Sequence, residues 1–190
     1  MTDYQHIIVD SPLESVSRIT LNRPDSRNAL NNVIRGEIYG PLEANDNNDA
    51  IRVTIIRGAG QAFCAGYDLK GNSDEDRPFH TAGGDGSWAR HVVDGAFRVW
   101  DLAKPVIAQV HGYCLAGGTE LATSCDLVYV AEDAKIGYPV VRSMSPPDNQ
   151  FFPWVVGMRN AMEMMLTGDA ISGTDAANYG FANRAFPVDE

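Results

Sequence analysis

Two glycine-bearing stretches, about fifty residues apart, carry the residues whose types and spacing could do chemistry. The first runs from Phe63 to Leu69, and the second runs from His111 to Glu120. Each follows an apolar run typical of a strand and offers small residues where a backbone N–H could face a ligand. Two such N–H groups that converge on one oxygen form an oxyanion hole. The pattern therefore predicts chemistry on a carbonyl compound, and a thioester is the expected class.

The second stretch opens a helical pattern with Gly117 at its N-terminal end, where the positive end of the helix dipole favours negative charge. Glu120 follows three residues later, one helical turn on and roughly on the same face. This spacing predicts a carboxylate beside whatever the oxyanion hole holds. A glutamate in a first helical turn is also favoured by the dipole alone, so a purely structural role is the alternative.

The elements that position these stretches alternate between strand and helix, which predicts an α/β fold. Strands are expected at 16–21, 51–57, 105–110, 126–130 and 184–186. Helices are expected from an Asn28 cap to Tyr39, over 88–103, 115–124 and 153–166, and from a Ser172 or Thr174 cap to Tyr179. Gly40-Pro41 is predicted to stop the first helix. The polar, Gly-rich segment 70–86 is predicted to be a loop, and the apolar stripe of the 88–103 helix is predicted to pack in the core.

Length and composition fit one globular domain, residues 1–190, with 44% hydrophobic residues and a net charge of −10. The negative charge argues against a nucleic-acid or anionic-membrane partner. The N-terminus lacks a secretory pattern, and three cysteines form neither a metal-type spacing nor an even framework. A cytoplasmic protein with reduced thiols and no metal site is expected.

With these residues placed, the chain resembles the crotonase superfamily, also called the enoyl-CoA hydratase/isomerase family. The resemblance runs over almost the whole chain and depends on the order and spacing of several motifs. These are Leu21-Asn22-Arg23-Pro24, Arg27-Asn28-Ala29-Leu30, Ala62 to Leu69, Lys104 to Ala108, His111 to Glu120, Cys125-Asp126-Leu127 and Leu166 to Asp169. It implies a crotonase-like spiral of repeated ββα units, commonly assembled as a homotrimer or as a hexamer.

The resemblance also implies an acyl-CoA substrate whose thioester oxygen lies between two main-chain N–H groups, which correspond here to Ala65 and Gly117. No permanently bound cofactor is implied, because coenzyme A is part of the substrate. Glu120 matches one of two glutamates that activate and position water in the hydratases. The residues implied in substrate and CoA binding are Ser26, Arg27, Ala29, Ala65, Gly66, Tyr67, Asp68, Leu69 and Gly117.

The chain departs from the hydratase pattern where the second glutamate is expected. Ile136-Gly137-Tyr138-Pro139-Val140 places a valine at that position, and valine cannot donate or accept a proton. Asp148, eight residues later, is a candidate second acid or nucleophile, because some family members place a working aspartate near this site. Its alternative role is to cap a helix that starts near Phe151.

The chain also ends about where the family's C-terminal helices are expected to begin, so these helices are predicted to be missing. The sequence therefore predicts an acyl-CoA-processing enzyme of the hydratase/isomerase type, with hydration, isomerisation and hydrolysis left open. A catalytically reduced acyl-CoA-binding or assembly subunit is the alternative.

Overall fold

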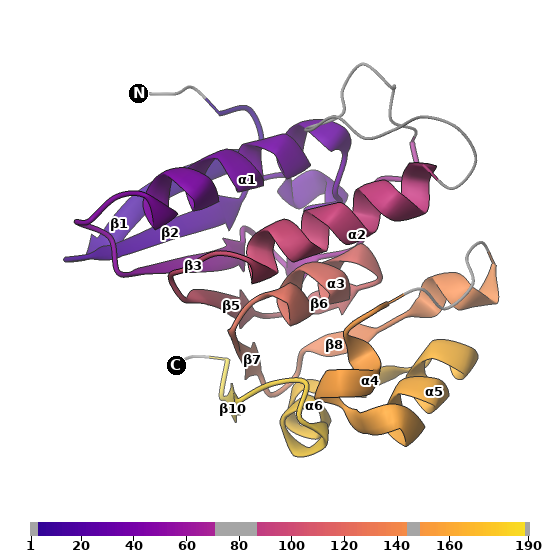
Figure 1. Ribbon diagram of the computed structural model, residues 1–190. Helices are drawn as coiled ribbons and strands as arrows, with labels where there is room; N and C mark the ends of the chain where they lie inside the picture. The colour runs from indigo at the N-terminus through magenta and orange to yellow at the C-terminus, as the bar shows by residue number, and fades with distance from the viewer. Residues whose placement is uncertain (1–3, 71–86, 144–148, 189–190) are drawn as a thin grey trace.

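A computed structural model describes residues 4–70, 87–143 and 149–188 of the chain. Two sheets and the helices packed on them form the fold (Figure 1). The larger sheet has the order β1-β2-β3-β5-β7-β10, with β1 antiparallel and the other neighbours parallel. Its strands are β1 Ile7–Leu13, β2 Val16–Leu21, β3 Val53–Gly58, β5 Val106–Val110, β7 Leu127–Ala131 and β10 Arg184–Phe186.

The smaller sheet has the order β4-β6-β8-β9 and collects short strands. They are β4 Ala62–Cys64, β6 Tyr113–Leu115, β8 Lys135–Gly137 and β9 Ala170–Ser172. The helices are α1 Asn32–Asp46, α2 Ser87–Trp100, α3 Gly117–Ser124, α4 Phe152–Val155, α5 Gly157–Thr167 and α6 Gly173–Tyr179, with 3-10 turns at Pro24–Ser26 and Pro139–Arg142.

Successive ββα units build this arrangement. In the unit of β3, β4 and α2, as in the unit of β5, β6 and α3, the first strand joins the larger sheet and the second strand joins the smaller one. Each unit therefore adds one parallel strand to both sheets before its helix returns the chain. The predicted crotonase-like spiral of ββα units is confirmed.

Alternating burial sets the two faces of the larger sheet. In β3 the side chains of Thr54 and Ile56 are buried, whereas those of Ile55 and Arg57 are partly exposed. A period of two is what one packed and one open sheet face produce. The open face is hollowed by a half-open cavity of ≈ 810 Å³, whose lining includes Tyr129.

The first helix differs from its prediction at both ends. Asn31, not Asn28, caps it by accepting a hydrogen bond from the Ile34 N–H at 2.9 Å. The helix then continues through Gly40 and Pro41 to Asp46. A proline inside a helix costs about 3 kcal/mol, but here Pro41 and Leu42 are buried against the core. Packing of the last turns therefore outweighs the local helix-stopping signal.

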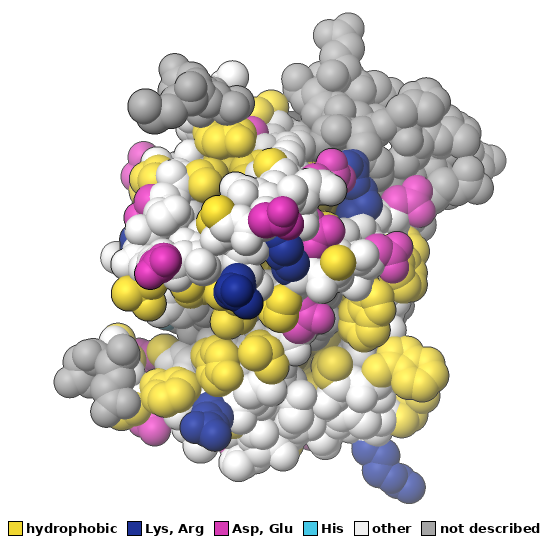
Figure 2. Space-filling view, turned by 60° about the vertical axis from the view of Figure 1, so that its left-hand side comes forward, with side chains coloured by type: hydrophobic (Ala, Val, Ile, Leu, Met, Phe, Trp, Pro, Cys, Tyr) yellow, Lys and Arg dark blue, Asp and Glu magenta, His cyan; other side chains and the backbone are white. Residues whose placement is uncertain are grey.

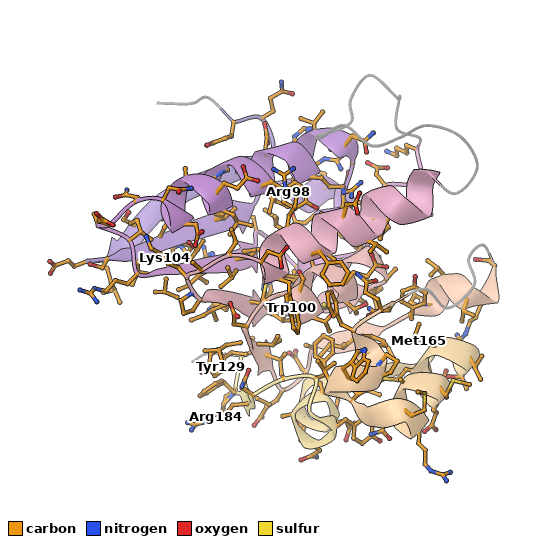
Figure 3. All side chains as sticks on the ribbon, viewed as in Figure 1. Arg98, Trp100, Lys104, Tyr129, Met165 and Arg184 are labelled. Atoms are coloured by element: carbon orange, nitrogen blue, oxygen red, sulfur yellow. The ribbon has the colours of Figure 1, made fainter. Side chains whose placement is uncertain are left out.

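The other helical predictions hold in type but not always in extent. The 153–166 helix is broken into α4 and α5 at Gly157, whose φ of 74° is left-handed. In α2, Val92, Ala96 and Val99 are buried as predicted, but Trp100 is 54% exposed. Trp100 projects from the end of α2 toward α4 (Figure 3) and stacks on Phe151 at 5.0 Å. The predicted 70–86 loop lies outside the described residues apart from Lys70.

All three cysteines are free and buried. Cys64 and Cys114 are register partners in β4 and β6 of the smaller sheet. Burial raises the pKa of the Cys64 thiol to about 12, so it stays protonated at neutral pH. The expectation of reduced thiols agrees with this burial. In the described ranges, no helix has both the length and the apolarity to cross a bilayer.

Asn28 fastens the turn before α1 to the strands that carry the first glycine-bearing stretch. Its side chain is fully buried, and its φ is 56°. The side-chain amide donates to the carbonyls of Ala59 at 2.9 Å and Ala62 at 2.7 Å, and its oxygen accepts from the Arg23 N–H at 2.9 Å. One side chain thus satisfies three backbone groups.

Replacing Asn28 by alanine should leave these backbone groups unpaired in a buried place. We expect Asn28→Ala to lower the free energy of unfolding by about 2–4 kcal/mol, measured by urea denaturation. Asn47→Ala is the matched control, because the exposed Asn47 amide makes one hydrogen bond, to the Glu43 carbonyl. Equal losses for the two variants would contradict the anchoring role of Asn28.

Candidate active site

Parallel pairing of two short strands brings the two glycine-bearing stretches side by side. β4 pairs with β6 in the smaller sheet, with Cys64 opposite Cys114. The chain continues from β4 into Ala65 and Gly66, and from β6 into the N-terminus of α3. Segments about fifty residues apart in the sequence therefore meet at one helix end.

Two glycines allow the backbones to approach closely. A Cβ added to Gly118 would lie 2.4 Å from the Cys64 carbonyl oxygen, so no side chain fits there. A Cβ added to Gly66, which has a φ of 102°, would lie 3.0 Å from the Leu115 carbonyl oxygen and 3.4 Å from the Gly117 nitrogen. The first turn of α3 thus rests directly on the 64–66 backbone.

Gly117 is the first residue of α3, where N–H groups have no intrahelical partner. Among the described residues, none accepts a hydrogen bond from its N–H. The preceding Ala116 has a φ of 48° and a ψ of −118°, a conformation costing about 1–3 kcal/mol for a residue with a Cβ. Hydrogen bonds hold it there, because the Ala116 N–H donates to Gly137 at 3.0 Å and its carbonyl accepts from Thr119 at 2.8 Å. The predicted position of Gly117 at a helix N-terminus is confirmed.

Ala65 does not have the geometry expected of the second donor. Its N–H donates to the Arg27 carbonyl at 2.9 Å. That internal pairing occupies the proton that a ligand oxygen would need. The expected pair of donors at Ala65 and Gly117 is therefore not present in this structure, although the two segments do meet.

Glu120 lies in the first turn of α3 with only 3% of its surface exposed. The Tyr67 hydroxyl donates to its Oε2 at 2.6 Å, and the Tyr138 hydroxyl lies 3.4 Å from its Oε1. Burial first, and then the negative charge of Glu120, raise the pKa of Tyr67 well above its ordinary value. Tyr67 therefore remains a neutral phenol that donates to the carboxylate.

A cavity of ≈ 30 Å³ lies beside this carboxylate. That volume holds about one water molecule. Its lining includes Glu120, Tyr67, Gly117 and Arg35. Arg35 is 3% exposed, and its guanidinium lies 5.5 Å from the centre of the Tyr67 ring. The site thus combines a buried carboxylate, a nearby cation and room for one small polar molecule.

Sequence reasoning named Tyr67 as a substrate-binding residue but not as a partner of Glu120, and it assigned no role to Tyr138 or Arg35. The phenols of Tyr67 and Tyr138 both reach Glu120, and Arg35 comes from α1. Tyr138 stands in the segment where the second glutamate is expected, immediately before Pro139. A hydroxyl-bearing residue at that place was a usable signal, whereas nothing local to Arg35 marks it.

The residues predicted to bind CoA lie along one edge of the site, before α1 and after β4. Ser26 and Ala29 are partly exposed, and the exposed Arg27 lies over the Tyr113 ring at 5.2 Å. Leu69 is 70% exposed. Asp68 has structural partners, because its carboxylate accepts from the Lys70 N–H at 3.0 Å and pairs with Arg23 at 2.9 Å. These contacts, with that of Lys70 the largest, lower the pKa of Asp68.

The segment after β8 supplies no second acid within the described residues. Val140 lies in the 3-10 turn Pro139–Arg142 and packs against the core, as a valine should. Asp148 lies outside the described residues. Both roles considered for it therefore stay predictions. The next residue, Asn149, accepts with its side-chain oxygen from the N–H groups of Phe151 and Phe152, at 3.1 and 3.2 Å. Arg142 is exposed and pairs with Asp169.

Comparison with known proteins gives a consistent result. Residues 12–190 match the family model described as enoyl-CoA hydratase/isomerase. A Mycobacterium tuberculosis protein named as an enoyl-CoA hydratase is 35% identical over 92% of this chain and 61% of its own length. The 2,3-dehydroadipyl-CoA hydratase of Escherichia coli is 33% identical over 96% of this chain and 70% of its own length.

Solved structures agree with this result. The crystal structure of an enoyl-CoA hydratase/isomerase from Xanthobacter autotrophicus superposes with a TM-score of 0.84 at 37% identity, over 98% of this chain and 69% of that one. The chain therefore spans about two thirds of the length of these proteins.

The contact of Gly118 with the Cys64 carbonyl can be tested by adding one methyl group. We expect Gly118→Ala to lower the free energy of unfolding by about 2–3 kcal/mol, because a backbone oxygen must move aside. Gly40→Ala is the matched control, since its Cβ meets nothing within 4 Å and should stabilise α1 by about 0.5–1 kcal/mol. Unfolding in urea measures both, and an equal effect of the two variants would contradict the close approach.

Proposed function

Because this chain belongs to the enoyl-CoA hydratase/isomerase family, we propose that it binds an acyl-CoA thioester and adds water to an α,β-unsaturated acyl chain. The observation that carries the proposal is the buried carboxylate of Glu120 next to the N-terminus of α3, with a water-sized cavity between the surrounding side chains. Water addition needs a base, a bound water and a site that stabilises negative charge on the thioester oxygen.

Gly117 is the first oxyanion donor in this proposal. Its N–H is available at the helix N-terminus, where the dipole of α3 adds to the hydrogen bond. Losing one donor of an oxyanion hole typically costs a factor of about 10²–10³ in rate. The contribution expected of Gly117 is of this size.

For the second donor we propose the main-chain N–H of Tyr67 in place of that of Ala65. Leu30 and Tyr67 form a parallel bridge in which Leu30 donates to the Gly66 carbonyl and Asp68 donates to the Leu30 carbonyl. In such a bridge the flanking residues make the hydrogen bonds, and the N–H of the central residue points to the opposite side of the segment. One side of the 66–68 segment pairs with Leu30. Gly66 lies against the Gly117 nitrogen, so the side away from Leu30, to which the Tyr67 N–H points, is the side that faces α3.

Glu120 serves as the base and positions the water in this proposal. Its burial keeps competing water away, and the phenol of Tyr67 fixes one of its oxygens at 2.6 Å. The cavity beside the carboxylate fits one water molecule, which favours hydration or hydrolysis over isomerisation. Relatives named as hydratases favour hydration of these two. The exposed segment around Ser26, Arg27 and Ala29 is proposed to contact the nucleotide part of CoA, with Arg27 as a phosphate partner.

The experiment is steady-state hydration of a short enoyl-CoA, run beside isomerisation and thioester hydrolysis assays. We expect Glu120→Gln to lower kcat by a factor of about 10²–10⁴, because the amide cannot take a proton from water. Glu163→Gln, at an exposed position of α5, is the matched control and should retain wild-type activity. Hydration that survives Glu120→Gln would overturn the proposal.

Other outcomes would select the alternatives. Turnover only in the hydrolysis or isomerisation assay would replace hydration by that reaction. Tight acyl-CoA binding in calorimetry, without turnover on any substrate, would identify a binding or assembly subunit.

We also propose that the chain forms a homotrimer or a hexamer. Four exposed side chains, Trp154, Met158, Met162 and Leu166, recur at every fourth residue along α4 and α5. Hydrophobic side chains also gather in a band across the middle of the face seen in Figure 2. Exposed apolar stripes of this kind mark protein contacts.

Light scattering coupled to gel filtration tests this assembly. Wild type should show three or six times the chain mass of 20.7 kDa. The double variant Met158→Glu, Met162→Glu should be monomeric, because it places charges in the stripe, whereas Glu163→Gln should not change the mass. A monomeric wild type would contradict the assembly.

A further inference from the structure

The proposed hydration does not yet say which group delivers a proton to Cα. Water addition places a hydroxyl on Cβ and a hydrogen on Cα of the acyl chain. Glu120 can take a proton from the water, and a proton must then reach Cα, either from Glu120 itself or from a second group. The position of the second acid holds Val140, which has none to give.

We propose that the phenol of Tyr67 delivers this proton to Cα. This inference rests on the proposed function, since it assigns a second catalytic residue to the same reaction. It goes beyond that function, because it gives the missing acid's role to a side chain on a different segment, directly after β4.

The ring of Tyr67 is in the right place for this role. A Cβ added to Gly117 would lie 2.7, 2.9 and 2.9 Å from three of its ring atoms, so the ring packs directly against the Gly117 α-carbon. Gly117 is also the proposed donor to the thioester oxygen. The acyl Cα is bonded to the carbonyl carbon, two bonds from that oxygen, so in this proposal the Cα of a bound thioester lies close to this ring.

The hydroxyl of Tyr67 is linked to the base. It donates to Oε2 of Glu120 at 2.6 Å, a short hydrogen bond with a carboxylate acceptor. The Tyr138 hydroxyl also approaches this carboxylate, but it lies 3.4 Å from Oε1. Tyr67 is therefore better placed than Tyr138 to exchange a proton with Glu120.

The proton balance closes through this hydrogen bond. The water oxygen bonds to Cβ as one water proton passes to Glu120, and the electron pair of the double bond moves into the enolate. Once Glu120 is protonated it becomes the donor of the hydrogen bond, which frees the phenol proton. That proton passes to Cα, the enolate returns to the thioester, and the phenolate takes the proton held by Glu120. The net change is the addition of one water molecule.

Proton affinities run in the required direction. Burial and the carboxylate keep the pKa of Tyr67 raised, so the resting side chain carries its proton. The α-carbon of a thioester enolate is far more basic than a phenolate, so transfer to Cα is downhill. Positioned proton transfer of this kind contributes a factor of about 10²–10⁴ in rate.

The test is Tyr67→Phe, which removes the hydroxyl alone. We expect kcat for enoyl-CoA hydration to fall by about 10²–10⁴, with the calorimetric affinity for a saturated acyl-CoA within about threefold of wild type. Exchange of the acyl α-hydrogens with D₂O, which reports proton transfer at Cα without water addition, should fall in parallel. Tyr129→Phe, in the hollow on the open sheet face, is the matched control and should leave all three unchanged.

The outcomes separate the two proposals. Active wild type together with a Tyr67→Phe variant that hydrates and exchanges at wild-type rates overturns the role of Tyr67 alone. A variant whose lost rate is matched by lost affinity also overturns it, because the hydroxyl would then act in binding. Inactive wild type overturns the proposed function, and this inference with it.

Circular dichroism verifies that the variant is folded. If Tyr67→Phe does not fold, 3-fluorotyrosine at position 67 keeps the ring and the hydroxyl and makes the phenol more acidic. We then expect the α-hydrogen exchange rate to change by at least twofold at constant affinity. An unchanged exchange rate overturns the proposal.

Discussion

A carboxylate held almost entirely out of water is the constraint on which the rest of this site depends. Burying an uncompensated charge costs many kcal/mol, so Glu120 is stable only where its surroundings replace the lost water. The replacements are the N-terminus of α3, two phenols from Tyr67 and Tyr138, and the nearby guanidinium of Arg35. They come from four separate segments, which only the spiral of ββα units brings together.

The same constraint explains the strict backbone packing around α3. If α3 stood away from the 64–66 segment, water would reach Glu120 and compete for its hydrogen bonds. Gly66 and Gly118 prevent such a separation, because without side chains they let the backbone of α3 contact the backbone of residues 64–66. Asn28 fixes the other side of the segment through the carbonyls of Ala59 and Ala62. Stability and chemistry are therefore coupled, because contacts that hold the first glycine-bearing stretch also keep the carboxylate dry.

Much of the fold follows from local signals in the sequence. Alternating apolar residues place the parallel strands. Ser172, one of the two caps expected for the last helix, caps α6 by accepting from the Asp175 N–H. Local signals fail where tertiary packing is stronger than they are. α1 runs through Pro41 because Pro41 and Leu42 are buried. Trp100, at the end of α2, stacks on Phe151 and stays half exposed instead of packing in the core.

The sequence predicts single residues of the site, but not the contacts between residues from different segments. Gly117 and Glu120 follow from glycine and acid spacing at a helix start, and both lie where that spacing places them. Ala65 lies in the segment that meets α3, as expected, but its N–H donates to the Arg27 carbonyl and is not available to a ligand. Backbone direction at a left-handed glycine such as Gly66 is a property of the folded chain, and no residue pattern encodes it. Contacts among Arg35, Tyr67 and Glu120 are likewise long-range.

The sealed thiols offer a way to watch this region move. Cys64 and Cys114 sit side by side on the short strands that lead into the site, and neither is reachable by a water-soluble alkylating reagent while the strands are paired. Labelling of Cys64 must wait for a transient opening of the smaller sheet, so its rate reports how often the catalytic segment separates from its helix. A ligand that contacts both glycine-bearing stretches would slow that labelling. The labelling rate of Cys64 therefore measures the fraction of protein with a ligand in the site.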